Sequence, residues 1–579
     1  MTQLSDAPSS ITPSASTTVA IPAPDPQDPQ LYPKLTDTQL KTIAQTAVCQ
    51  CYDAGSTLFD HGQPHAPFFI LEQGTVQFFD RNAHHPTDAP EPFVTVEAGN
   101  ILGDIAQFTG EPTVAECVAK TDCQVLRLEP DQLRQLIAEH ADIGDKILTA
   151  FIARRSWLKG HGIGTIKLLG SRWSPEAFRL RDFLARNQIL HKFYDLERDH
   201  QATELLDRFG IAPEDTPVTI CPQGVSRNPS IEQLASHLGL RQIVDDTRVV
   251  DLLIVGAGPA GLAAAVYAAS EGLDTLVIEG DSPGGQAGTS SKIENYLGFP
   301  TGLSGQELAE RATLQAKKFG ATLTNPARVT AIDCDGTYKT VTLDEGEQAQ
   351  RVQARTVIIA TGAEYRKLRI DGCDRFDNRG VYYGASHSEA VQCAGECVVV
   401  VGGGNSAGQA AVNLAKHARE VHILIRRENL CSSMSKYLIE RINKTANITL
   451  HPHTEITSLN GDDRLESITT IQNQSHTTGQ LGCTSAYIMI GAAPRTDWLH
   501  GCCLLDPKGF VLTGNQAAQH PDFAQNWSLD RPPHYLETSK ENVFAVGDVR
   551  AGSIKRVASA VGEGSMCLRY VHDALATLA

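Results

Sequence analysis

The 579-residue sequence predicts an α/β protein with two doubly wound units that follow an all-β unit and a smaller α/β unit. Two observations carry this prediction. The order strand, glycine loop, helix and second strand occurs between Val249 and Glu279 and again between Cys397 and Arg427. Short alternating apolar runs broken by glycines fill much of residues 31–158, a pattern typical of antiparallel strands.

Composition restricts the setting and the partners of the protein. A formal net charge of −17 argues against nucleic acid or an anionic membrane as the main partner, and no apolar run reaches the roughly eighteen residues of a membrane span. Fourteen scattered cysteines and the lack of a basic N-terminal region favour a cytoplasmic protein with reduced thiols. Residues 1–30, rich in Ser, Thr, Pro and Ala, predict a disordered tail.

Residues 31–158 predict a first folded unit, with strands such as Thr75–Phe79 and helical sequence from Pro130 to Leu158. This unit resembles the cyclic nucleotide-binding domain, an all-β roll with flanking helices. Gly103-Asp104 matches the start of that family's phosphate cassette, but Thr113 stands where the family has the arginine that pairs with the cyclic phosphate. The resemblance therefore implies a β-roll kept for dimerisation or docking, with cyclic-nucleotide sensing as the alternative.

Residues 159–246 predict a second unit, with a helix at Pro175–Asn187 and a strand at Val218–Cys221. It resembles a thioredoxin or glutaredoxin fold, with Thr216-Pro217 where that family has its cis-proline. Where the family has C-x-x-C, this chain has Trp173-Ser174-Pro175-Glu176. Without thiols at that place the unit cannot exchange disulfides, so we expect a structural or partner-binding role.

The first glycine loop follows an apolar strand at Leu252–Val255. Gly256, Gly258 and Gly261 have the G-x-G-x-x-G spacing that permits a tight turn, a close approach of a diphosphate and close packing of helix on strand. The N-terminus of the following helix offers free N–H groups to phosphates. Glu279 ends the second strand, where a carboxylate can accept a hydrogen bond from a ribose hydroxyl.

The second glycine loop follows the strand Cys397–Val401 and has the G-x-G-x-x-A form. Its residues are Gly402, Gly404, Asn405, Ser406 and Ala407. An acidic residue after the second strand would favour NAD, but this copy has Arg426 and Arg427 there. Because two guanidinium groups suit a 2′-phosphate, the pair predicts NADPH as the cofactor.

Two nested Rossmann-like dinucleotide-binding domains make residues 250–579 similar to the thioredoxin-reductase-like flavoproteins. The resemblance implies an FAD site formed by Gly256, Gly258, Pro259, Gly261, Glu279, Gly285, Gln286, Asn295, Val329, Ala360, Thr361, Gly362, Asp548, Arg556, Val557 and Ala558. The domains would be the tail (1–30), the β-roll (31–158), a thioredoxin-like unit without C-x-x-C (159–246), two halves of an FAD domain (247–365 and 500–579) and an NAD(P)H domain (366–499).

The chain departs from the reductases at their redox-active C-x-x-C. Gly384 and His387 replace the two cysteines, and no C-x-x-C occurs anywhere in the sequence. Cys393 and Cys397 lie nearby with three residues between them, and we expect both to be structural. His387 is a candidate catalytic proton donor, because the pKa of histidine lies near neutrality.

The resemblance thus implies an NADPH-dependent FAD oxidoreductase, and a homodimer, in which electrons pass from NADPH to FAD and then to an acceptor that the sequence does not identify. The acceptor would be a small molecule or a redox protein. Alternatives are thioredoxin reduction through a non-standard dithiol, ferredoxin or quinone reduction, and a flavin-based redox sensor in place of an enzyme. The N-terminal units would regulate the enzyme or dock a partner.

Overall fold

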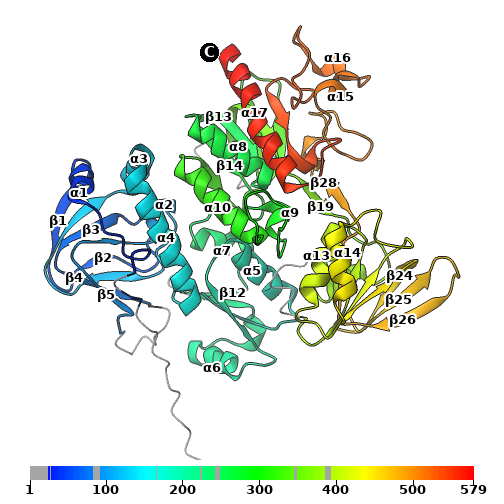
Figure 1. Ribbon diagram of the computed structural model, residues 1–579, viewed down its shortest axis with the longest axis horizontal. Coiled ribbons are helices and arrows are strands. Elements are labelled where there is room, and N and C mark those ends of the chain that lie inside the picture. The colour runs from blue at the N-terminus through cyan, green and yellow to red at the C-terminus, as the bar shows by residue number, and fades with distance from the viewer. Residues whose placement is uncertain are drawn as a thin grey trace, which may run out of the picture.

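The computed structural model describes residues 24–25, 28–81, 91–164, 166–221, 224–241, 248–344, 349–384 and 393–578 (Figure 1). The chain forms four units, which we name the β-roll unit, the thioredoxin-like unit, the outer α/β unit and the inserted α/β unit. Figure 1 shows the β-roll unit (blue to cyan) on one side and the inserted unit (yellow) on the other, with the thioredoxin-like unit between them. No helix in these ranges is long and apolar enough to cross a membrane.

The β-roll unit consists of two four-stranded antiparallel sheets, ordered β1-β8-β3-β6 and β2-β7-β4-β5, with helices on one side. Its elements are α1 (Asp37–Ala44), β1 (Val48–Tyr52), β2 (Thr57–Phe59), β3 (Phe68–Gln73), β4 (Thr75–Phe79), β5 (Val94–Glu97), β6 (Asn100–Leu102), α2 (Ile105–Thr109), β7 (Glu116–Ala119), β8 (Cys123–Leu128), α3 (Pro130–Glu139) and α4 (Ala141–His161). Inward-facing aromatic residues such as Phe59 and Phe69 fill the space between the sheets. Helical sequence that we expected to run from Pro130 to Leu158 is divided at His140 into α3 and α4.

The thioredoxin-like unit is a four-stranded sheet in the order β10-β9-β11-β12, with the first pair parallel and the others antiparallel. Its elements are β9 (Ile166–Gly170), α5 (Pro175–Arg186), β10 (His191–Asp195), α6 (His200–Phe209), η1 (Pro213–Asp215), β11 (Val218–Cys221), β12 (Gly224–Arg227) and α7 (Ile231–His237). The Thr216–Pro217 peptide is cis, as expected. Ser174 caps α5 by accepting a hydrogen bond from the Ala177 N–H, so the replaced C-x-x-C segment still begins a helix.

The outer α/β unit has a sheet in the order β15-β14-β13-β18-β17-β16, with β29 pairing beside β18. Its elements are β13 (Val249–Val255), α8 (Pro259–Ser270), β14 (Thr275–Ile278), α9 (Gly285–Gly288), α10 (Gly305–Lys318), β15 (Thr322–Thr324), β16 (Val329–Asp333), β17 (Lys339–Leu343), β18 (Gln350–Ile359), η3 (Asp497–Leu499), α15 (Gly514–Ala518), α16 (Phe523–Asn526), β29 (Val543–Ala545), η4 (Gly547–Val549) and α17 (Val557–Leu578). Because β29 follows the inserted unit in sequence but pairs parallel to β18, the second unit is nested within the first.

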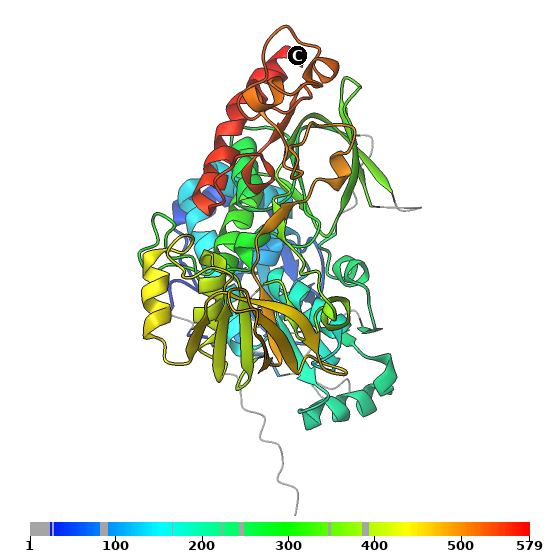
Figure 2. The same cartoon turned by 90° about the vertical axis from the view of Figure 1, so that its right-hand side faces the viewer.

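The inserted unit has a parallel sheet in the order β20-β27-β21-β22-β23, and a three-stranded antiparallel sheet β24-β25-β26 covers it. Its elements are α11 (Cys373–Phe376), β20 (Val381–Tyr382), β21 (Cys397–Val401), α13 (Asn405–Leu414), β22 (Glu420–Leu424), α14 (Lys436–Lys444), β23 (Ile448–His451), β24 (Thr454–Asn460), β25 (Ser467–Gln472), β26 (Thr478–Gly482) and β27 (Ser485–Ile488). A two-stranded sheet connects it to the outer unit, formed by β19 (Ala363–Tyr365) and β28 (Ala492–Pro494). Figure 2 shows the antiparallel strands in front and α17 (red) above them.

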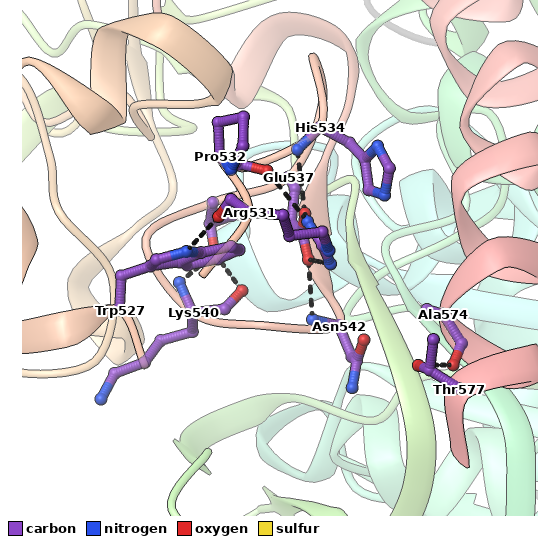
Figure 3. A network of polar contacts seen from close by, with 10 residues as sticks. Trp527, Arg531, Pro532, His534, Glu537, Lys540, Asn542, Ala574 and Thr577 are labelled. Atoms are coloured by element: carbon purple, nitrogen blue, oxygen red, sulfur yellow. Dashed lines mark hydrogen bonds and ion pairs between the residues drawn. The ribbon is translucent and has the colours of Figure 1, made fainter. Parts of the chain in front are cut away.

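A buried carboxylate fixes the segment of the outer unit that leads into β29 (Figure 3). Glu537 is fully buried and accepts hydrogen bonds from Arg531 Nη1 and Nη2 at 2.7 and 3.0 Å and from the N–H groups of His534 and Asn542. The buried Glu537 carboxylate thus pairs with the partly exposed Arg531 through two charge-assisted hydrogen bonds. The strand β29 ends at Ala545, and a 3₁₀ turn begins at Gly547.

Candidate cofactor site

A single cavity of about 1360 Å³ joins the two glycine loops. It lies at the carboxyl ends of β13 and β21, where open parallel sheets bind their ligands. Predicted residues lining it are Gly256, Gly258, Pro259, Glu279, Gly285, Gln286, Val329, Ala360, Thr361, Gly362, Gly402, Gly404, Ser406, Arg426, Arg427, Asp548, Arg556 and Val557. The fold thus brings together residues that are up to three hundred positions apart in the sequence.

The first glycine loop has the geometry of a diphosphate cradle. Gly256 has φ +106°, and a Cβ there would clash with the carbonyl oxygen of Ala360, so glycine is required at the turn. A Cβ on Gly258 would meet no protein atom within 4 Å and would instead occupy the space of a ligand. Pro259 begins α8 beside it, so the free N–H groups of this helix face the same space.

Two polar side chains on the outer-unit side of the cavity, Gln286 and Glu279, indicate whether this side suits a flavin dinucleotide. Gln286 has a buried Oε1 without a hydrogen-bond partner among the described residues, as expected of a group that awaits a ligand. Glu279 is only 7% exposed and accepts hydrogen bonds from the N–H groups of Ala257 and Asp281 at 2.7 and 2.9 Å. Burial raises the pKa of Glu279, and these N–H donors oppose the rise. These residues fit FAD.

The inserted-unit side of the cavity carries the positive charge predicted for a 2′-phosphate. Arg426 and Arg427 are both exposed on its lining, and Arg427 Nη1 donates to Ser432 Oγ at 2.9 Å. Ser433 Oγ donates to the Gly403 carbonyl at 2.8 Å and ties this loop to the glycine turn. The site can therefore hold two guanidinium groups against a phosphate dianion.

Five of the predicted residues lie off the cavity lining. Gly261 packs against the Gly256 carbonyl, where a Cβ would clash, so it serves the close contact of helix with strand. Asn405 Oδ1 accepts a hydrogen bond from the Ser435 N–H at 2.7 Å. Ala407 is fully buried. Asn295 and Ala558 are exposed to solvent. His387, the candidate proton donor, lies outside the described residues.

Cationic residues that sequence reasoning missed also line the cavity. Arg495 pairs with Asp281 at 3.2 Å and with Glu364 at 3.3 Å, and Lys555 donates to the Asp548 carbonyl at 2.8 Å. Burial raises the pKa of Asp548, while Lys555 opposes the rise. Arg186 reaches the cavity from the thioredoxin-like unit. No motif marks Arg186, because its place depends on how separate units pack.

Comparison with known proteins agrees with this geometry. Residues 250–564 match the family described as pyridine nucleotide-disulphide oxidoreductase, and residues 49–140 match the cyclic nucleotide-binding domain. The chain belongs to the pyridine nucleotide-disulphide oxidoreductases. It is 33% identical over 321 residues to a thioredoxin reductase of Mycolicibacterium smegmatis. This alignment covers 55% of this chain and 93% of that protein. It is 32% identical over 323 residues to NADPH-dependent thioredoxin reductase 3 of Arabidopsis thaliana, covering 55% of this chain and 56% of that protein.

Structural comparison gives the same assignment. The crystal structure of Lactococcus lactis thioredoxin reductase matches with a TM-score of 0.50 and 26% identity, and the match covers 57% of this chain and 99% of that one. The oxidoreductase is an NAD(P)H-dependent flavin enzyme whose family uses FAD and NADPH. When bound, these cofactors supply hydride and electron transfer, and the residues of the chain bind and orient them.

A smaller pocket lies within the β-roll unit. Its volume is about 70 Å³, and aromatic residues such as Phe59 and Trp157 line it. Thr113 is buried, and its hydroxyl donates to the Asp60 carbonyl. Asp104 caps α2 through the Ala106 N–H, and its other oxygen lies 3.6 Å from Arg155. Both cassette residues therefore contact the protein itself.

Proposed function

We propose that this oxidoreductase uses NADPH to reduce bound FAD and passes the electrons to a small molecule or a one-electron carrier. The observation that carries the proposal is the missing relay. A buried flavin passes electrons to a protein disulfide only through an intervening thiol pair. Gly384 stands at one position of that pair, and His387 stands at the other in the sequence.

The thiols nearest in sequence are poorly suited to replace the relay. Cys393 is 1% exposed and Cys397 8% exposed, and burial raises the pKa of the Cys397 thiol, which disfavours the reactive thiolate. Among the described residues, Cys334 and Cys502 have sulfur atoms 2.8 Å apart, but both are buried and neither lines the cofactor cavity. These contacts support an exit route that needs no dithiol.

The thioredoxin-like unit itself packs beside the strand that leads to Gly384. Phe178 of α5 lies against Tyr382 with ring centroids 5.4 Å apart, and the Arg464 guanidinium lies 4.9 Å from the ring of Trp173. Phe178 is part of the buried core of the inserted unit. Because the chain's own unit occupies this surface, a separate protein disulfide has less access to it.

Anaerobic stopped-flow spectroscopy tests the proposal. NADPH should reduce the flavin, and a quinone, ferricyanide or oxygen should reoxidise it, while oxidised thioredoxin should have little effect. Cys393→Ser, Cys397→Ser and Cys502→Ser should leave both half-reactions unchanged. Rapid thioredoxin reduction that one of these serine variants abolishes would show that a non-standard dithiol is the relay.

His387→Ala separately tests the proposed proton donor. Reoxidation by a two-electron acceptor should slow, while flavin reduction by NADPH keeps its rate. Reoxidation by ferricyanide, which takes electrons without protons, is the internal control. An equal loss in all three reactions would indicate a structural role for this histidine.

A further inference from the structure

Helix α5 of the thioredoxin-like unit bridges both cofactor-binding units. At its N-terminal half, Phe178 packs into the inserted unit, as described above. At its C-terminal end, the Ala185 carbonyl accepts a hydrogen bond from Gln306 Nε2 of α10, and Asn187 Oδ1 accepts one from Asn325 Nδ2 at 2.7 Å. Figure 1 shows α5 at the centre of the molecule, between the outer and inserted units. The residue between the two anchors is Arg186.

Arg186 lines the cofactor cavity beside Glu279 and Asp281. Its side chain is 25% exposed, and its Nη1 lies 3.9 Å from Asp182 one turn earlier, which is too far for a hydrogen bond. Burial raises the pKa of Glu279, and the Arg186 guanidinium is the smallest of the influences that oppose this rise. The side chain is thus held at the cavity while its charge is only weakly neutralised.

The acidic residues at this edge have other partners. Glu279 is hydrogen-bonded to two backbone N–H groups, and Asp281 pairs with Arg495 at 3.2 Å. The N-terminus of α8, which adds positive potential, lines the same cavity. An anionic ligand complements this arrangement better than a neutral or cationic one does.

We propose that Arg186 is an additional cofactor-binding residue, whose guanidinium pairs with the diphosphate of the ADP half of FAD. This inference rests on the assignment of FAD to the outer-unit side of the cavity. The thioredoxin-like unit then has a role that needs no thiols, because it contributes a cofactor-binding residue from outside the FAD-binding domain. Gln306 and Asn325 act as positioning residues, since they hold the end of α5 without lining the cavity.

Flavin binding to the full-length apoprotein tests the proposal. Arg186→Gln should raise the dissociation constant of FAD, measured by quenching of flavin fluorescence, at least tenfold, because one charge-assisted contact changes affinity by about ten- to a hundredfold. Arg186→Lys should recover part of the loss by restoring the charge. The inhibition constant of ADP as a competitor should rise by the same factor as the FAD dissociation constant.

Arg179→Gln is the matched control, because Arg179 lies on the same helix and is exposed. Its FAD affinity should equal that of the wild type. Gln306→Ala should weaken FAD binding less than Arg186→Gln does, since it only loosens the helix end. The apoproteins should share one melting temperature, which separates cofactor binding from folding.

An FAD dissociation constant of Arg186→Gln within twofold of the wild type would overturn the proposal and leave Arg186 as a partner of Asp182. A lowered FAD affinity with an unchanged ADP inhibition constant would also overturn it, because the contact would then lie elsewhere on the flavin. Failure of the wild type to bind FAD would instead overturn the cofactor assignment on which the inference rests.

Discussion

The cofactor cavity and the β-roll pocket both resemble nucleotide sites, but their polar groups have different partners. In the cavity, Gln286 Oε1 has no hydrogen-bond partner among the described residues, and Gly258 faces open space. In the β-roll, Arg154 donates to the carbonyls of Leu31, Ile101 and Gly103. Asp104 Oδ2 and Arg155 Nη1 of the β-roll also lack a hydrogen-bond partner among the described residues, so hydrogen bonding distinguishes the two pockets only in part.

The volumes of the two pockets also differ. The cavity holds about 1360 Å³ and the β-roll pocket about 70 Å³, whereas small-molecule sites generally measure roughly 300–1,000 Å³. Tyr32 lies against Arg154, with the guanidinium 5.2 Å from its ring, and both line the smaller pocket. A fold and a family match therefore show ancestry, while the volume of the pocket indicates whether a ligand can enter.

The largest effect is expected from closing the diphosphate cradle. Gly258→Val should abolish FAD binding and give a colourless protein, because the new side chain occupies ligand space. Gly258 has φ −71° and its Cβ would meet no protein atom, so the variant should fold. Flavin absorbance per chain and the circular dichroism of the apoprotein provide the measurements. A yellow Gly258→Val protein would contradict the assignment of this loop.

Removing the internal donor of the β-roll should have the next largest effect. Arg154→Ala leaves three carbonyls without their donors and should destabilise the unit by about 2–4 kcal/mol. Burial lowers the pKa of Arg154 to about 10, so the guanidinium stays charged at neutral pH. Differential scanning calorimetry should show that the β-roll unit unfolds at a lower temperature, with Lys120→Ala, whose side chain is exposed, as the control. An unchanged transition would mean that these hydrogen bonds contribute little.

Local sequence predicted much of the fold because the signals are local. The strands Thr75–Phe79, Val218–Cys221 and Cys397–Val401 are confirmed residue for residue, since each apolar run is bounded by turn or polar residues. Glycine spacing located both loops for the same reason. The roles of Arg186 and Arg154 could not be predicted, because the cavity that Arg186 lines and the carbonyls to which Arg154 donates belong to segments far away in the sequence.

Cofactor preference should change by a smaller factor. Replacing Arg426 and Arg427 together with Ala should reduce the ratio of NADPH to NADH efficiency at least tenfold, or about 1.4 kcal/mol, mainly through NADPH affinity. Both residues are exposed on the cavity lining, so stability should change little. Flavin reduction rates at several concentrations of each nucleotide measure the ratio, and Arg419→Ala is the exposed control. Equal wild-type efficiencies with the two nucleotides would refute the 2′-phosphate assignment.

The smallest effect is expected from cyclic AMP. Calorimetry with the full chain should detect no binding, because the pocket is too small and its residues are bonded to the protein. Restoring the family's arginine with Thr113→Arg should not create a site, since Thr113 is 3% exposed and its hydroxyl is hydrogen-bonded to Asp60. The variant should instead lose stability by about 1–3 kcal/mol, because a buried hydrogen bond is lost and a charge is buried in its place. Low-micromolar binding by the wild type would contradict this prediction and show that the β-roll pocket enlarges to admit a ligand. The β-roll pocket would then be a regulated ligand site, and the cofactor cavity a permanently open one.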